Sequence, residues 1–120
     1  MPSDLQSGLE KEFVQAALAR SRWLRQGDAN KAGREYQKLR GITQKLRALH
    51  DRGEQVFKRI AGSQDAEVRI LGAAGLLAVD EAFATIVLQK IMQGRDKSIA
   101  FDAEMTLKEW QSGFNREFWE

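Results

Sequence analysis

Residues 63–77 read SQDAEVRILGAAGLL, and this stretch decides the fold. Its apolar side chains surround the predicted helix instead of forming a stripe along one face. A helix that is apolar on every side must be covered by other elements on several sides. We therefore expect a helix over 66–78 at the centre of the molecule. Gly72 and Gly75 are expected to be points of close contact with a neighbouring helix rather than hinges.

The residues on both sides of this stretch also predict helices. The single proline stands at position 2, and there is almost no β-branched alternation. Glycine commonly follows the last turn of a helix, and aspartate commonly caps the first turn. The glycines in question are Gly27, Gly53, Gly62, Gly94 and Gly113, and the aspartates are Asp28, Asp65, Asp80 and Asp96. These glycine and aspartate positions predict an all-α fold of about six helices, over 4–25, 28–51, 54–61, 66–78, 81–93 and 97–112.

The first two expected helices are long and joined by the short turn at 26–28. Each would span about 30 Å at a rise of about 1.5 Å per residue. Each also has apolar residues spaced in threes and fours, which is typical of a helix with one buried face. We expect an antiparallel hairpin whose core-facing residues are Leu9, Phe13, Ala16, Ala17 and Leu24 on one helix and Ala32, Tyr36, Leu39, Leu46 and Leu49 on the other.

Arg69 occupies an unusual position in the first turn of the central helix. Asp65 stands four residues before it, which is the favourable order for a helical ion pair. A cation near the N-terminus nevertheless opposes the helix dipole. We therefore expect Arg69 to bond carbonyl or carboxylate oxygens of an adjacent helix.

The chain resembles the HEAT repeat in its second half. The segments that carry the resemblance are IAGSQDAEVRILGAAGLLA, then DEAFATIVLQKIM and IAFDAEMTLKEW. Residues 28–112 are also similar in layout to an uncharacterised bacterial family of short HEAT-like helical domains. The resemblance implies an α-α superhelical layer, with no catalytic residues carried across. The chain departs from the repeat pattern in two places. The first hairpin lacks the Asp/Val-Arg signature, and the tail lies beyond the pattern. Repeat proteins need capping elements at their ends, and these two parts would serve as caps.

Composition predicts a single domain over 1–120. Within it we distinguish a basic N-terminal hairpin (1–52), HEAT-like helices (53–112) and an aromatic tail (113–120). The apolar fraction is 42% and the charged fraction 30%, as in globular proteins. Residues 1–60 contain 13 Lys and Arg against 7 Asp and Glu, whereas residues 61–120 contain 6 against 10. Because the N-terminus lacks a secretory pattern and no apolar run could cross a membrane, we expect a soluble, cytoplasmic protein without a membrane partner.

The sequence contains no group of residues that predicts catalysis. There is no cysteine, and His50 is the only histidine. It stands near the end of the second helix, where a cation favours the helix dipole, and no metal-ligand partners have a useful spacing to it. Asp102 and Glu109 share one helix face, but a solvated face is the ordinary role of such acids. We expect no enzymatic activity, no cofactor and no metal.

We therefore expect a non-catalytic protein-binding module, and within that class a bacterial immunity protein or inhibitor that covers the active site of a cognate toxin. The acidic second half would suit a basic partner such as a nuclease domain, since charge complementarity speeds association. Exposed aromatic residues also tend to mark partner surfaces. The candidate partner-binding residues are Asp80, Glu81, Asp102, Glu104, Glu109, Trp110, Phe114, Phe118 and Trp119.

Three alternatives remain open. Lys31, Arg34, Lys38 and Lys45 form one stripe on the second helix, which would suit a nucleic-acid backbone. The aromatic tail could instead be exchanged between copies of a homo-oligomeric structural subunit. It could also fold back and complete the chain's own core.

Overall fold

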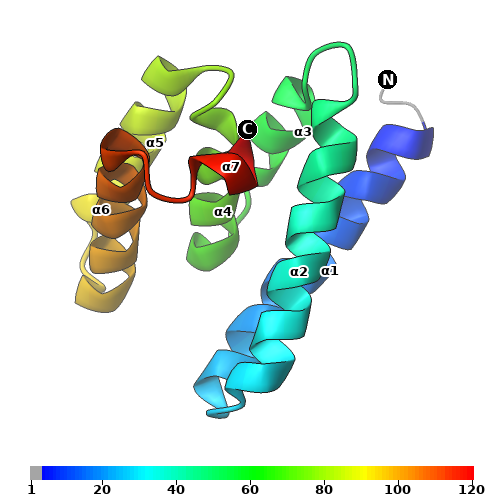
Figure 1. Cartoon of the computed structure of the whole chain (residues 1–120). Helices are drawn as coiled ribbons and strands as arrows, with labels where there is room; N and C mark the ends of the chain where they lie inside the picture. The colour runs from blue at the N-terminus through cyan, green and yellow to red at the C-terminus, as the bar shows by residue number, and fades with distance from the viewer. Residues whose placement is uncertain (1–3) are drawn as a thin grey trace.

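The computed structural model describes residues 4–120, and these residues form seven α-helices and no strand (Figure 1). The predicted fold class is confirmed, and a short helix within the tail is added to the six expected ones. The helices are α1 (Asp4–Arg25), α2 (Ala29–Arg47), α3 (Glu54–Ile60), α4 (Ala66–Leu76), α5 (Glu81–Met92), α6 (Lys97–Ser112) and α7 (Arg116–Trp119).

All four predicted aspartate caps are present. The side chains of Asp28, Asp65 and Asp80 accept hydrogen bonds from the backbone N–H groups three residues later. Asp96 accepts from the N–H groups of both Ser98 and Ile99. Each bond satisfies a donor that the first turn of a helix would otherwise leave free. These local contacts explain why the starts of α2, α4, α5 and α6 lie within one residue of their expected positions.

The second helix ends four residues earlier than the sequence predicted, at Arg47 instead of residue 51. Its continuation is a turn in which the Asp51 carboxylate accepts from the N–H groups of Gly53 and Gln55. Arg52 and Gly53 both have positive φ, at 57° and 83°. Asp51 thus competes with the helix for local hydrogen bonds, as short polar side chains do. His50 lies exposed in this turn rather than in the helix.

Helix α4 is the central element, as its apolar surface predicted. It packs against α1, α3, α5 and α6, and all its residues from 72 to 76 are buried. Gly72 and Gly75 are the expected contact points. A Cβ on Gly72 would lie 2.5 Å from the backbone nitrogen of Ala61, and one on Gly75 would overlap the ring of Phe57. Without these two glycines, α3 could not lie directly on α4.

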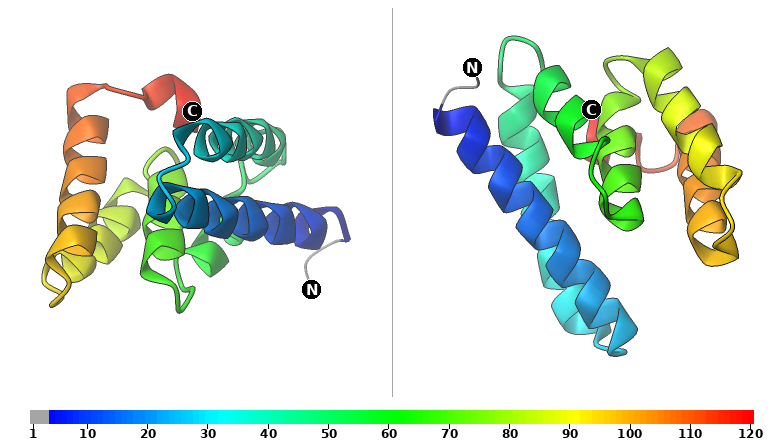
Figure 2. Two further views of the ribbon diagram at one scale, coloured as in Figure 1. Left: turned by 90° about the horizontal axis from the view of Figure 1, so that it is seen from below. Right: turned by 180° about the vertical axis from the view of Figure 1, so that it is seen from behind.

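The helices form three successive pairs with the tail across them (Figure 1). The long α1–α2 hairpin stands on one side, the α5–α6 pair stands on the other, and α4 lies between them with α3. The tail leaves the end of α6 and returns to α2, which it contacts through α7 (Figure 2). One buried cluster includes side chains from every helix, among them Phe13, Phe57 and Leu88.

Arg47 joins three separate parts of the chain. Its guanidinium donates to the backbone oxygens of Arg52 (2.7 Å), Trp119 (2.6 Å) and Gly75. It also lies 4.9 Å from the centre of the Phe57 ring. Burial, and secondarily the charge of Arg52, lowers the pKa of Arg47 to about 10, so that the group stays charged at neutral pH. The α2–α3 turn, α4 and α7 are therefore held by one side chain.

Leu24, which was expected to face the core, is exposed instead, and two apolar side chains of α5 are exposed as well. Leu24 is 49% exposed, because the tip of the α1–α2 hairpin extends beyond α4 (Figure 1). Phe83 and Ile86 of α5 are 41% and 53% exposed. The Lys58 ammonium lies 5.1 Å from the centre of the Phe83 ring and covers part of it.

The prediction for Arg69 was wrong in its choice of partner. Its guanidinium makes long hydrogen bonds to the carbonyls of Ser63 and Gln64, at 3.4 and 3.5 Å. These residues belong to the turn before its own helix, not to a neighbouring helix. Within residues 4–120 it forms no ion pair with Asp65, whose carboxylate is engaged by the N–H of Val68. Turn carbonyls thus offset the unfavourable dipole.

Candidate functional site

An open groove of about 630 Å³ lies between the α1–α2 hairpin and α6. Its floor is the face of α4 that carries Ile70, Leu71, Ala74 and Leu77. Ile70 and Leu77 are buried and Leu71 is half-buried. The floor is therefore apolar, as the interior of a binding site commonly is.

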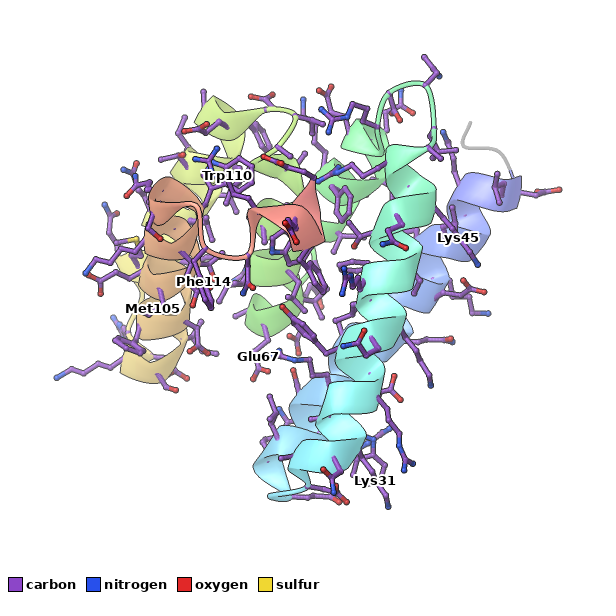
Figure 3. The ribbon with its side chains drawn as sticks, in the orientation of Figure 1. Lys31, Lys45, Glu67, Met105, Trp110 and Phe114 are labelled. Carbon is purple, nitrogen blue, oxygen red and sulfur yellow. The ribbon has the colours of Figure 1, made fainter. Side chains whose placement is uncertain are left out.

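The two walls bring together residues that are far apart in the sequence. The hairpin wall includes Arg20, Leu24 and Tyr36, and the α6 wall includes Asp102, Met105, Thr106, Glu109 and Trp110. Glu67, in the first turn of α4, lies at the base between them. Figure 3 shows Glu67 and Phe114 between α6 and α2, with Met105 on α6. Leu24, exposed near the tip of the hairpin, lines the groove as well.

The groove is acidic on balance. Its charged residues are the three carboxylates of Glu67, Asp102 and Glu109 and the single guanidinium of Arg20. Partial burial raises the pKa of Asp102, Glu67 raises it further, Arg20 opposes this and Asp96 adds a smaller increase. Within residues 4–120 Asp102 and Glu109 have no ion-pair partner, and Glu67 pairs with the exposed Arg25 at 3.5 Å. The carboxylates of the α6 wall are thus only weakly compensated.

Tyr36 connects the hairpin wall to the tail. Burial raises the pKa of its hydroxyl, Arg20 lowers it, and Glu109 raises it. The Arg20 guanidinium lies 5.4 Å from the centre of the Tyr36 ring, and the ring of Phe118 lies 4.6 Å away from it. Tyr36 therefore presents both an aromatic surface and a polar group at the boundary of the groove.

The four candidate aromatic residues have different environments. Phe118 and Trp119 are buried, at 8% and 9% exposed, and their rings contact each other at 4.5 Å. Trp110 is also buried, while Phe114 is 61% exposed at the rim of the groove. The tail therefore folds back on the chain's own core. In this arrangement Phe114 is the tail aromatic that is most accessible to a partner.

Three of the five candidate acids lie outside the groove. Asp80 caps α5 and pairs with Lys58 at 3.3 Å, and Glu81 is exposed in the first turn of the same helix. Glu104 pairs with Lys108 at 3.0 Å on α6. The acidic face expected from the sequence is therefore divided, and only Asp102 and Glu109 line the groove.

The basic stripe on α2 is exposed over its whole length. Lys31 and Lys45 lie on the side of α2 away from the groove (Figure 3). Lys31 pairs with Asp28 at 3.8 Å and lies 4.4 Å from the centre of the Trp23 ring, and Lys38 pairs with Glu35 at 3.1 Å. Arg34 and Lys45 have no ion-pair partner among residues 4–120. The charges of Lys31 and Lys38, two of the four cations in the stripe, are therefore partly neutralised by neighbouring carboxylates.

Two kinds of feature are absent from residues 4–120. No group of three or more His, Cys, Asp or Glu side chains in this range is arranged to hold a metal ion. In the same range, none of the helices has the length and apolar character required to cross a bilayer.

Sequence reasoning missed Arg20, Tyr36 and Glu67 as groove residues. Tyr36 was assigned to the core, and Arg20 counted only toward the basic balance of residues 1–60. Glu67 is an ordinary first-turn acid by its sequence. No spacing rule connects these positions with residues 102–109, because the groove exists only once α1, α4 and α6 are packed.

Comparison of the chain with protein-family models, curated proteins and solved structures gave no match. The class that fold and site define is an all-α protein with an acidic groove over an apolar floor.

Proposed function

We propose that this chain is a protein-binding module whose groove receives a basic, amphipathic helical segment of a partner protein. The observation that carries the proposal is the combination of the apolar floor on α4 with the carboxylates of Glu67, Asp102 and Glu109. A helix with apolar residues on one face and cations beside it matches both features. Laying an amphipathic helix into an apolar groove is a recurring mode of recognition.

The role expected from the sequence is a specific form of this proposal. In it the partner is a toxin, such as a basic nuclease domain, and the HEAT-like layer is the scaffold that presents the groove. A pull-down from the native host followed by identification of the captured protein tests this form. Capture of a basic toxin supports it. A partner that still binds after Asp102 and Glu109 are both reversed in charge contradicts it.

Charge reversal on the α6 wall is expected to weaken binding. The probe is a fluorescein-labelled helical peptide with leucines on one face and lysines on the other. Changing Asp102→Lys and Glu109→Lys together should raise its Kd about tenfold or more, because the groove then repels the peptide. Fluorescence anisotropy measures the affinity, and raising the salt concentration should reduce the difference.

The matched control is Glu104→Lys on the same helix. Glu104 pairs with Lys108 and does not line the groove, so this variant should bind the peptide nearly as well as the unmodified protein. A second control peptide carries glutamates in place of lysines and should bind weakly. Equal affinity of the two peptides would overturn the proposal.

Peptide binding is expected to strengthen as the pH rises through the pKa of Asp102. That pKa is raised by burial and by Glu67, is opposed by Arg20, and is raised slightly by Asp96. A bound lysine favours the carboxylate and lowers the pKa, so the complex holds fewer protons than the free protein. Affinity therefore increases with pH above the ordinary aspartate range. Titration by anisotropy should show a smaller pH dependence in Asp102→Asn, and an unchanged dependence would contradict this assignment.

A further inference from the structure

The tail closes one end of the groove through few attachments. Phe114, Asn115 and Trp119 line the groove, and α7 contacts α2. The attachments include the Arg47 hydrogen bond to the Trp119 carbonyl, a long one from Arg52 to Glu120 at 3.4 Å, and the ring contact of Phe118 with Tyr36. Arg116 of the tail also donates from Nε to the Trp110 carbonyl at 2.9 Å. The tail is thus held mainly by two aromatic side chains and by the guanidinium groups of Arg47 and Arg116.

The chain changes direction between α6 and α7 at two residues with left-handed backbone conformation. Gly113 and Asn115 both have positive φ, at 86° and 62°. Helix α7 has four residues and no side-chain cap at its start, and helices this short have little stability of their own. Movement about residues 113–115 would leave the backbone of α6 in place, at the cost of the hydrogen bond from Arg116 Nε to the Trp110 carbonyl.

Arg47 does not depend on the tail for its position. Its other donors bond the carbonyls of Arg52 and Gly75, and its guanidinium lies against Phe57. Release of Trp119 would cost one of three hydrogen bonds and leave α2, α4 and the turn joined. At the other end, the Arg116 guanidinium lies 4.3 Å from the centre of the Trp110 ring.

We propose that residues 113–120 are a strap that closes one end of the groove in the free protein and moves away when a partner segment enters. This inference rests on the protein-binding function proposed above. The apolar face of the incoming helix takes the place of Phe118 and Trp119 against Tyr36, and its cations meet Asp102 and Glu109. The free protein binds more weakly than its groove alone would, because only the open fraction is competent to bind.

A single cysteine in place of Phe118 tests the strap, since the natural chain has no cysteine. A thiol at this buried position should react with a maleimide at least tenfold more slowly than one introduced by Phe114→Cys, which is exposed. Addition of the leucine–lysine peptide should raise the reaction rate of Phe118→Cys about tenfold and leave that of Phe114→Cys unchanged. Anisotropy on the same samples reports whether the peptide is bound.

The outcomes separate the strap from the function it regulates. A bound peptide that leaves the reaction rate of Phe118→Cys unchanged overturns the strap and retains the binding groove. Absence of peptide binding overturns both proposals.

A cross-linked tail provides a second test. The double variant Tyr36→Cys and Phe118→Cys, once oxidised, fixes α7 to α2, and mass spectrometry shows whether the bridge has formed. The oxidised form should bind the peptide about tenfold more weakly than the reduced form of the same protein. Equal affinities of the two forms would overturn the strap.

Discussion

Replacement of Gly72 by alanine is expected to lower the free energy of unfolding by about 3 kcal/mol, which is toward the upper end of overpacking effects. The added Cβ would lie 2.5 Å from the backbone nitrogen of Ala61 and 2.7 Å from the carbonyl carbon of Ile60. Backbone atoms cannot move aside as the end of a flexible side chain can. The α3 and α4 helices must therefore separate, which opens the core around Ile60. Urea denaturation followed by circular dichroism measures the change.

The same substitution at Gly41 is the matched control. Gly41 lies inside α2, and a Cβ there would have no heavy atom within 4 Å. Because alanine is the better helix former, Gly41→Ala should raise the free energy of unfolding by about 0.5–1 kcal/mol. If Gly72→Ala were as stable as the unmodified protein, the close packing of α3 on α4 would be wrong.

Substitution of Arg47 by methionine is the second change with a large expected effect. Methionine retains much of the apolar contact with Phe57 but leaves the carbonyls of Arg52, Gly75 and Trp119 without their shared donor. Hydrogen bonds to charged groups contribute more than neutral ones, and partly buried acceptors without partners are costly. We expect the free energy of unfolding to fall by about 3 kcal/mol, measured by urea denaturation.

Two controls separate the hydrogen bonds of Arg47 from its charge. Arg47→Lys keeps the charge but has no planar fork of donors, so it should recover only a small part of the loss. Arg40→Met removes an exposed arginine from the same helix and should change stability by less than about 0.5 kcal/mol. A fully stable Arg47→Lys variant would show that charge alone, rather than the three bonds, holds these segments together.

The effects of Gly72 and Arg47 also bear on the proposed groove. Gly72 sets how closely α3 lies on α4, whose other side is the groove floor. Arg47 holds both α4 and the end of the tail that closes the groove. Loosening either contact should therefore alter peptide binding as well as stability. The proposed strap distinguishes Arg47→Met from Gly72→Ala. Arg47→Met also removes the hydrogen bond to Trp119, so it should increase the rate at which a cysteine at position 118 reacts with maleimide.

The sequence by itself determined the helices and the central element. Asp28, Asp65, Asp80 and Asp96 bond backbone N–H groups two or three residues away, so their effect could be predicted without knowing the rest of the fold. The helix with apolar residues on all sides could lie only at the centre. The roles of Gly72 and Gly75 followed from the same pattern, since small residues on such a helix allow a neighbour to approach.

Only the tertiary structure decided the groove and the position of the tail. Asp102 and Glu109 share a helix face by their spacing, but their proximity to Arg20, Tyr36 and Glu67 depends on how α1, α2 and α4 pack. The Arg47 bonds to carbonyls up to 72 residues away have no sequence signal, since every residue has a carbonyl. Local hydrogen bonds and apolar periodicity act over one or two turns of helix and can be read along the chain. The groove and the Arg47 hydrogen bonds are made of contacts between distant segments, and these contacts exist only after the core has packed.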